Sequence, residues 1–279
     1  MDQQLFHIYR NTPAGRETIM QSLYFCKMIG AYPVVYIPEF TKFLMYFEND
    51  IVQVDLDDSY LTSPETAEMR AAELLKEEGF DPKFLKPKNY TASALPDIPI
   101  NFDFMCCPRS ISDLSSKIGL SYIGPRVRRI VKSAHFPVLL TSPVFKKWHS
   151  VTLFFGGSAN AIKALKLALH ICRESGLPLD IFTYLESGYK KEYYEKIIKN
   201  HDLEKELKKY RVEWQIFDKG TFEENLYEVK HDSLAVLGAF GHGIIKDILF
   251  GSKMETIQST IYNNLLIVGP NYKAYSMLA

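Results

Sequence analysis

Residues 151–176 read VTLFFGGSANAIKALKLALHICRESG, and this stretch decides the fold. A short apolar run at 151–155 is followed by Ser158 and then by a segment whose apolar residues recur every three or four positions, up to Gly176. This order predicts a strand, a capping residue, a helix with one buried face and a terminal glycine. A strand that leads directly into such a helix is typical of parallel α/β sheets.

The same order occurs at the start of the chain, where residues 5–30 read LFHIYRNTPAGRETIMQSLYFCKMIG. Pro13 falls at the first helical position, where its missing N–H is not needed. Strands and helices then alternate through both halves, which predicts two doubly wound parallel sheets. Further strands are expected near 33–38, 83–86, 102–107, 138–141, 179–184, 211–217, 234–237 and 265–268, and further helices over 65–78, 127–134, 190–209, 222–229 and 254–262.

The natural boundary between the halves is the polar segment 146–150, which predicts domains at 1–145 and 151–279. The first half carries an insertion at 39–62. Its aromatic and apolar residues Phe40, Phe43, Leu44 and Phe47 have helical spacing, so we expect a helix there.

Composition excludes several classes of protein. The chain has 279 residues, of which 47% are hydrophobic and 24% charged, so global disorder is excluded. Lys plus Arg and Asp plus Glu both number 33, and this balance argues against a nucleic-acid binder. Without an apolar run of about 18 residues or a signal segment, we expect a cytoplasmic protein with no membrane span. The 4 cysteines show no CxxC spacing and are expected to be reduced thiols rather than disulfides or zinc ligands.

The segment that bears on function is 238–252, GAFGHGIIKDILFGS. Gly238 and Gly241 follow an expected strand at the carboxyl edge of the second sheet, where open α/β sheets bind their ligands. Glycines there let backbone N–H groups approach a phosphate closely. Ser252 begins an expected helix, whose N-terminus favours an anion. The segment therefore predicts a phosphate cradle.

At these positions the sequence resembles the universal stress protein family, whose ATP-binding members carry G-x2-G-x9-G-(S/T). Gly238, Gly241, Gly251 and Ser252 match every fixed position. The resemblance covers the whole chain and implies two tandem Rossmann-like domains, each an open five-stranded parallel sheet flanked by helices. It also implies a universal stress response protein that binds ATP in its C-terminal domain.

The resemblance assigns roles to further residues and elements. Gly243 and the four matching residues would together hold the phosphates. Magnesium would be the counter-ion of the phosphates. Backbone groups just after Tyr184 would meet the base. Many family members associate through their last strands, which implies an intramolecular pseudo-dimer with Leu139 and Leu266 near the contact, and leaves open whether whole chains also form a homodimer.

The sequence departs from the family pattern in both halves. Family ATP binders carry Asp at the end of the first strand, where this chain has Gly156 in the second half and Arg10 in the first. In the first half the two loop glycines are replaced by Ile111 and Leu114, and Pro125 replaces the serine. We therefore expect a degenerate first domain without a site of the family type.

Several motifs also have simpler structural explanations. Gly238 and Gly241 could form a tight turn with no ligand. Ser252 and Glu255 have the spacing of a capping box, which is compatible with a phosphate contact. His242 suits a surface turn better than a phosphate contact.

Other polar groups are expected to be structural rather than functional. For Asp55, Asp57 and Asp58 the favoured interpretation is a solvated loop rather than a metal site. Cys106 and Cys107 are expected to be a buried pair. For Arg126, Arg128 and Arg129 a solvated helix face is favoured over an anion site.

No catalytic constellation stands out, because the sequence has no G-x-S-x-G elbow and no HExxH spacing. The leading hypothesis is an adenine-nucleotide (ATP) binding and signalling module that passes its signal to a protein partner. The alternative is a nucleotide-independent interaction module that uses the 39–62 insertion as its docking surface. Slow ATP hydrolysis ranks third.

Overall fold

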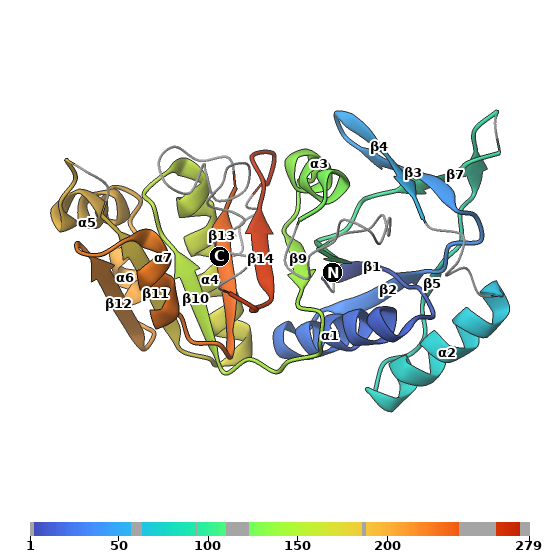
Figure 1. Ribbon diagram of the computed structural model, residues 1–279, viewed down its shortest axis with the longest axis horizontal. Coiled ribbons are helices and arrows are strands. Elements are labelled where there is room, and N and C mark those ends of the chain that lie inside the picture. Colours follow the sequence, from blue (N-terminus) through green and yellow to red (C-terminus); the bar gives the residue numbers. More distant parts are fainter. Residues whose placement is uncertain are drawn as a thin grey trace. The chain divides into compact units, whose positions relative to one another are not determined.

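The computed structural model describes residues 3–56, 63–92, 94–109, 123–185, 188–239 and 261–273. The chain divides into two compact units, Met1–Lys146 and Lys147–Ala279. In Figure 1 unit 1 is coloured from blue to green and unit 2 from yellow-green to red.

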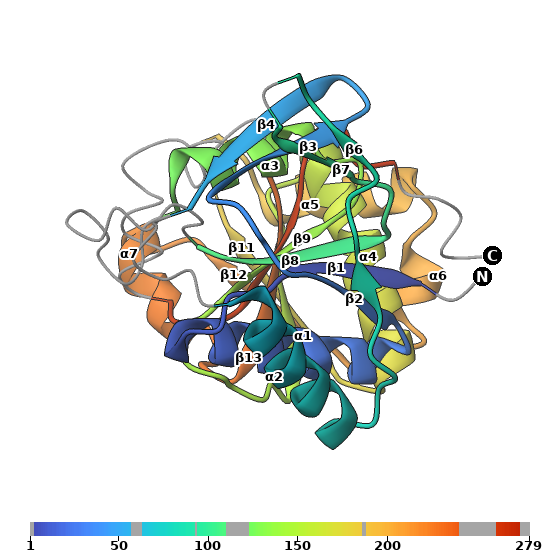
Figure 2. The same cartoon turned by 90° about the vertical axis from the view of Figure 1, so that its right-hand side faces the viewer.

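Unit 1 contains a five-stranded parallel sheet with the strand order β9-β8-β1-β2-β5. Figure 2 shows α1 and α2 on one side of β1, β2 and β8, and α3 with β3 and β4 on the other. The strands are β1 (Gln4–Ile8), β2 (Tyr32–Tyr36), β5 (Phe84–Leu85), β8 (Phe104–Pro108) and β9 (Val138–Thr141), and the helices are α1 (Pro13–Ile29), α2 (Pro64–Glu77) and α3 (Pro125–Ser133).

Unit 2 contains a second five-stranded parallel sheet with the equivalent order β12-β11-β10-β13-β14. The α/β fold expected from the sequence is therefore confirmed. The strands are β10 (Ser150–Phe154), β11 (Leu179–Tyr184), β12 (Val212–Phe217), β13 (Ser233–Gly238) and β14 (Leu265–Val268); the helices are α4 (Ala159–Ser175), α5 (Lys191–Asn200), α6 (Glu204–Leu207), α7 (Phe222–Asn225) and the 3-10 helix η3 (Leu226–Glu228).

The first helix of each unit begins and ends on the same kinds of residue. Thr12 accepts a hydrogen bond from the Gly15 N–H at 2.9 Å, and Ser158 accepts one from the Ala161 N–H at 3.1 Å. Gly30 and Gly176 end the two helices in the left-handed region, with φ of 67° and 70°. Glycine adopts this conformation without strain, so the helix ends are set locally by sequence.

The helix expected over 190–209 is interrupted. It forms α5 and the short α6, separated at His201–Leu203, and Asp202 has a φ of 55°. A right-handed helix cannot contain a left-handed residue, so the expectation of one continuous helix is wrong. Most of the expected helix 254–262 lies outside the described residues.

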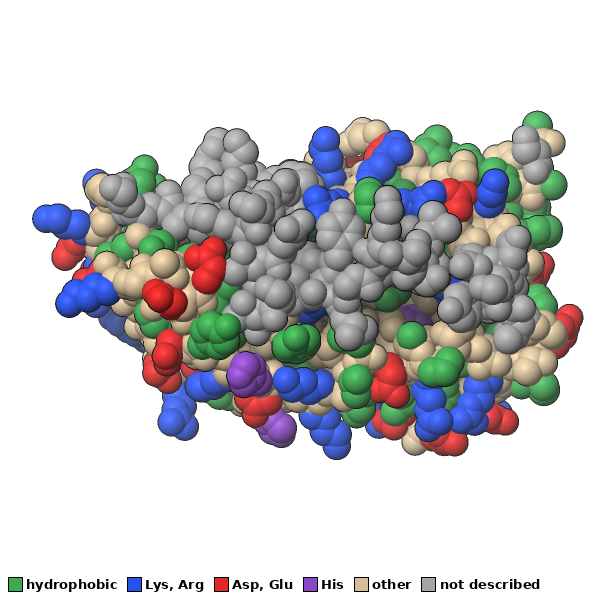
Figure 3. All heavy atoms as spheres, viewed as in Figure 1, with side chains coloured by type: hydrophobic (Ala, Val, Ile, Leu, Met, Phe, Trp, Pro, Cys, Tyr) green, Lys and Arg blue, Asp and Glu red, His purple; other side chains and the backbone are tan. Residues whose placement is uncertain are grey.

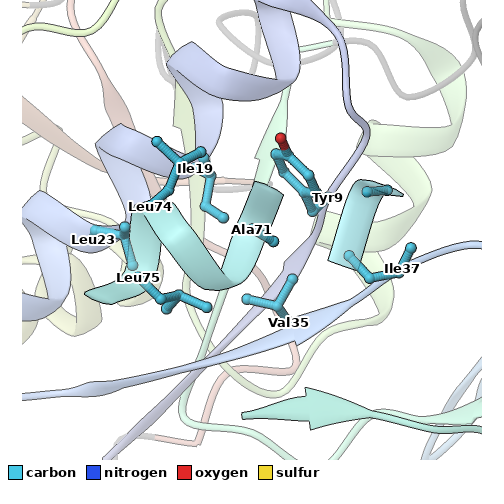
Figure 4. Close-up of a cluster of buried hydrophobic side chains, with 9 residues drawn as sticks. Tyr9, Ile19, Leu23, Val35, Ile37, Ala71, Leu74 and Leu75 are labelled. Atoms are coloured by element: carbon cyan, nitrogen blue, oxygen red, sulfur yellow. The ribbon is translucent and has the colours of Figure 1, made fainter. Parts of the chain in front are cut away.

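The core of unit 1 lies between α1, α2 and the sheet (Figure 4). Burying each large aliphatic side chain contributes about 1.5–3 kcal/mol, so this layer is a main source of the unit's stability. The buried members are Tyr9, Ile19, Leu23, Val35, Ile37, Ala67, Ala71, Leu74 and Leu75.

Polar and sulfur-containing side chains also lie inside unit 1. Cys106 and Cys107 are both buried, which confirms the interpretation of a core pair. His7 is fully buried with its Nδ1 atom 2.7 Å from Ser22 Oγ, and burial lowers the pKa of His7 to about 3. The imidazole is therefore neutral at physiological pH and belongs to the core.

The described part of the insertion, residues 39–56, forms a hairpin and not a helix. Strands β3 (Lys42–Phe47) and β4 (Asp50–Asp55) pair antiparallel and join β6 (Asn89–Tyr90) and β7 (Pro96–Pro99) in a sheet of order β4-β3-β7-β6. Phe43, Met45 and Phe47 alternate into the core, with exposed fractions of 0%, 0% and 7%. The expectation of a helix is wrong because every second side chain is buried, which is the pattern of a strand with one face toward the core.

Ion pairs hold this hairpin to α3. Arg129 donates from Nε and Nη2 to the Asp50 carboxylate at 2.9 and 2.6 Å, and Ser133 Oγ donates to the same carboxylate at 2.6 Å. Arg126 pairs with Asp55. These side chains therefore bind their own chain, and the interpretation of both arginines as a merely solvated face is wrong. The interpretation of Asp55 as part of a solvated loop is also wrong, because Asp55 ends β4 and pairs with Arg126.

The remaining residues of the two motifs are Arg128 in the arginine set and Asp57 and Asp58 in the aspartate set. Arg128 Nε donates to the Ile123 carbonyl oxygen at 2.9 Å. Asp57 and Asp58 lie outside the described residues, and within the described ranges no group of three or more His, Cys, Asp or Glu could hold a metal ion.

Replacing Asp50 with Asn should lower the free energy of unfolding by about 1 kcal/mol at neutral pH. Hydrogen bonds from Arg129 and Ser133 hold the pKa of Asp50 well below its usual value. The stabilisation is thus fully present above the pKa of the unfolded carboxyl, about 3.9, and is lost as the pH falls through the folded value.

Urea unfolding of the Asp50→Asn variant between pH 7 and pH 3 measures this effect, with Glu39→Gln as an exposed carboxylate control in the same unit. The difference between the wild type and the Asp50 variant should shrink below pH 4. A difference that is independent of pH would contradict the role of the carboxylate.

The surface and the helices give two further facts. On the face shown in Figure 3, basic and acidic side chains are interspersed, in keeping with the balanced charge. Among the helices of the described ranges, none is both long and apolar enough to cross a membrane.

Candidate functional site

The topology of unit 2 marks one point at the edge of the sheet, called the crevice below, as the place for a ligand. β10 and β13 are neighbours in the middle of the sheet. From β10 the chain passes through α4 to β11, on the side away from β13, and β14 lies beside β13 on the side away from β10. Open α/β sheets bind ligands outside the carboxyl ends of their strands, at the point where the strand order reverses. In unit 2 this point lies between residues 155–158, after β10, and residues 238–239, at the end of β13.

Gly238 lets β13 and α4 approach each other closely. A Cβ atom at Gly238 would lie 2.4 Å from both the carbonyl carbon and the carbonyl oxygen of Asn160. Asn160 Nδ2 donates to the Ala239 carbonyl oxygen at 2.5 Å. Packing against α4 thus requires a glycine here, and the start of the glycine segment is fixed to the first turn of that helix.

A second glycine turn follows β10, the strand that pairs with β13. Gly157 has a φ of 73°, in the left-handed region that favours glycine, and Gly156, Gly157 and Ser158 are all half-buried. The turn is therefore accessible, and Gly156 gives it no side-chain carboxylate.

Lys163 is a basic residue at this edge that sequence reasoning missed. Its Nζ donates to the Pro270 carbonyl oxygen, just after β14, at 2.9 Å, and burial lowers the pKa of the ammonium group. A lysine among several in one helix gives no signal in the sequence. Its significance comes from α4, which carries it to the carboxyl ends of β13 and β14.

Tyr184 lies at the carboxyl end of β11 but makes contacts of its own. Its hydroxyl donates to the Gly220 carbonyl oxygen at 3.0 Å, and its ring packs against Phe222 at 5.7 Å. The next N–H, of Leu185, donates to the Phe217 carbonyl oxygen at 2.9 Å. The first backbone donor after Tyr184 is therefore already used within the sheet.

The structure brings together only part of the site expected from the sequence. Gly156 and Gly238 lie at the crevice, and Tyr184 lies one strand away. The remaining expected residues, Gly241, His242, Gly243, Gly251, Ser252 and Glu255, lie outside the described residues.

The corresponding crevice of unit 1 is built differently. The register of β1 and β8 pairs Leu5 with Phe104, and Arg10 and Arg109 follow the carboxyl ends of these two strands. Arg109 is 5% exposed, and burial lowers its pKa to about 10. Gly124 begins α3 with Pro125 as its first residue. Ile111 and Leu114 lie outside the described residues.

Three solved structures resemble the chain over nearly its whole length. A universal stress protein from Archaeoglobus fulgidus DSM 4304 has a TM-score of 0.63 and 16% identity, with 95% of this chain and 96% of that one covered. A putative universal stress protein from Pseudomonas aeruginosa UCBPP-PA14 has a TM-score of 0.57 and 9% identity, with coverage of 97% and 94%. The cytoplasmic domain of a prokaryotic cation chloride cotransporter has a TM-score of 0.52 and 11% identity, and 98% of each chain is covered.

No protein-family model and no curated protein matches the sequence. The strand order and the crevice define an α/β protein of the Rossmann-like class. Within that class, the chain has the fold of the universal stress proteins. At these identities the likeness concerns the fold.

Proposed function

We propose that the chain is a universal stress protein that binds one adenine nucleotide, ATP, at the carboxyl edge of unit 2 and acts as a binding and signalling module. The observation that carries this proposal is the position of Gly238. It ends β13 at the reversal point of the sheet, and the spaced glycines of the family motif follow it directly in the sequence.

The residues of the crevice fit the phosphate end of such a ligand. N–H groups of the segment that contains Gly238, Gly241 and Gly243 would donate to phosphate oxygens, and Ser252 would add its hydroxyl. Lys163 supplies a half-buried ammonium group near the same strand ends. Magnesium would accompany the phosphates as their counter-ion.

The structure weakens the alternative of an interaction module that uses the insertion. Phe43 and Phe47 are buried within unit 1, so they cannot form a docking surface. Phe40 and Ile51 remain exposed, at 44% and 47%. Among residues 39–56, the part of the insertion that the structure describes, single exposed apolar side chains such as these are normal on a protein surface and do not indicate a partner.

Mass spectrometry under native conditions on the gently purified full chain tests the proposal. We expect a mass increase that corresponds to one adenine nucleotide per chain, or the same increase after ATP is added. A chain that takes up no nucleotide at any ATP concentration would favour the interaction module.

Replacing Gly156 with Asp should tighten ATP binding about tenfold. One hydrogen bond to a carboxylate contributes roughly 1–3 kcal/mol, and the turn at Gly156 has no carboxylate of its own. Calorimetry on the full chain measures the change, and Gly156→Asn is the matched control without charge. Weaker binding by the Asp variant alone would mean that the added carboxylate faces the phosphates.

A further inference from the structure

The sheets of the two units end in equivalent edge strands of different length. β5 is the edge strand beside β2 in unit 1, and β12 is the edge strand beside β11 in unit 2. β5 has 2 residues and β12 has 6. Within unit 2, β12 lies at the opposite end of the sheet from the last strand, β14 (Figure 1). The longer edge is therefore distinct from the last strand, through which many proteins of the family associate.

The short edge of unit 1 is protected against pairing with another chain. Pro82 and Lys83 precede β5, and Lys86 and Pro87 follow it. Proline has no N–H to donate, and short length and lysine side chains are further means by which natural proteins block an exposed strand edge. β5 therefore presents very little edge to a partner strand.

The edge of unit 2 carries none of these protective features. Residues 212–217 read VEWQIF, with no proline or lysine and with Glu213 as the one charged residue. The register of β12 with β11 runs without a bulge, and every residue of β12 is half-buried or exposed. An edge strand of this kind is open to pairing with another strand.

Three residues of β12 direct their backbone groups away from β11. The carbonyl oxygens of Arg211 and Phe217 accept hydrogen bonds from the N–H groups of Leu179 and Leu185, at 3.1 and 2.9 Å. Successive residues of a strand point their backbone groups to opposite edges, so the odd-numbered residues serve β11. The even-numbered residues point outward, and among the described residues no strand lies beyond β12. These outward residues are Val212, Trp214 and Ile216.

The sequence of β12 suits antiparallel pairing with a second copy of itself. A two-fold axis perpendicular to the sheet keeps the two faces of the sheet continuous, so each residue meets one that points to the same face. With Trp214 on the axis, the two Trp214 residues meet, Val212 meets Ile216, and Glu213 meets Gln215. One face then joins apolar side chains, and the other places an amide opposite the carboxylate. No like charges lie directly opposite each other in this register.

We propose that the β12 edge is a self-association surface, through which two copies of the chain join their unit 2 sheets into one continuous sheet. The outward N–H and C=O groups supply the hydrogen bonds, and the pairs across the axis fix the register. A single pair of strands buries little surface, so the expected dissociation constant is on the order of 10–100 µM. This inference does not depend on the nucleotide site, because no residue of that site belongs to β12.

Sedimentation velocity of the full chain, over concentrations that span this dissociation constant, measures the association. We expect the wild type to pass from monomer to dimer as its concentration rises. Ile216→Lys places a charge opposite Val212 of the second copy and should weaken the dimer at least tenfold. Leu85→Lys is the matched control, because Leu85 is a half-buried apolar residue of the equivalent edge strand in unit 1, and it should leave the dimer unchanged.

Cysteine cross-linking tests the register and does not depend on the stability of the lysine variant. Glu213 and Gln215 would form a pair without backbone hydrogen bonds between them, in which the Cα atoms come close enough for a disulfide. Under mild oxidation, a mixture of Glu213→Cys and Gln215→Cys chains should give a disulfide-linked dimer, and neither variant alone should. The native cysteines are all buried and should not compete.

Three results would overturn the proposal. The wild type could remain a monomer at every concentration, or the Ile216→Lys variant could fold and form the dimer as strongly as the wild type. The mixture of cysteine variants could also give no more cross-linked dimer than either variant alone. Each result would mean that the long edge of unit 2 is not where two copies meet.

Discussion

Replacing Gly238 with Val is expected to lower the free energy of unfolding by about 3 kcal/mol, the upper part of the range for overpacked sites. A Cβ at this position would meet backbone atoms of Asn160 at 2.4 Å and the Ala161 nitrogen at 2.8 Å. Backbone in the first turn of a helix cannot move aside as a flexible side chain could. Relief therefore requires α4 to move away from β13, which would break the Asn160–Ala239 hydrogen bond.

Thermal and urea unfolding of the full chain measure this loss, and Gly176→Ala is the matched control. Gly176 has a φ of 70° and no atom within 4 Å of its Cβ position. Backbone strain alone should therefore lower the free energy of unfolding of this variant, by about 1 kcal/mol. If both variants lose the same stability, close packing of β13 against α4 is not what requires glycine at 238.

Replacing Gly241 with Val is expected to weaken ATP binding at least tenfold, or about 1.4 kcal/mol. Gly241 follows Gly238 by three residues in the sequence and belongs to the proposed phosphate cradle. A β-branched side chain there would keep the backbone from a phosphate and disfavour any positive φ.

Equilibrium dialysis with ATP measures the affinity, and the circular dichroism spectrum should stay the same as that of the wild type. Gly124→Val, at the equivalent of Gly251 in unit 1, should leave ATP binding unchanged. An unaltered affinity in the Gly241 variant would show that the glycine segment is only a turn.

Local signals made most of the fold predictable from the sequence. Thr12, Gly30, Ser158 and Gly176 mark the ends of the first helices because capping depends on residues within one turn. The last strand of unit 2 was expected at residues 265–268 and lies there, because four apolar residues stand between two asparagines and a Gly-Pro pair that ends the strand.

The insertion and the second helical region of unit 2 could not be predicted in the same way. Phe40, Phe43, Leu44 and Phe47 fit a helical spacing, but Phe43, Met45 and Phe47 fit an alternating one equally well. Pairing with β4 and β7, which come later in the chain, decides between them. The break at Asp202 likewise depends on a left-handed residue that no local pattern indicated.

The candidate site was predictable only where glycine is the signal. Gly156 and Gly238 could be found because a strand end followed by glycine is a recognisable pattern. Lys163 could not be found, because it sits within an ordinary amphipathic helix. Its position becomes apparent only when α4 carries it to the carboxyl ends of β13 and β14, where its Nζ donates to the Pro270 carbonyl oxygen.

The measurement that tests the central claim most directly is isothermal titration calorimetry of the full chain with ATP, repeated with the Gly241→Val and Gly124→Val variants. A single adenine-nucleotide site in unit 2 predicts one ATP bound per wild-type chain with modest affinity, strong loss in Gly241→Val and no change in Gly124→Val. Two ATP molecules per chain, or one that is lost only in the Gly124 variant, would contradict it.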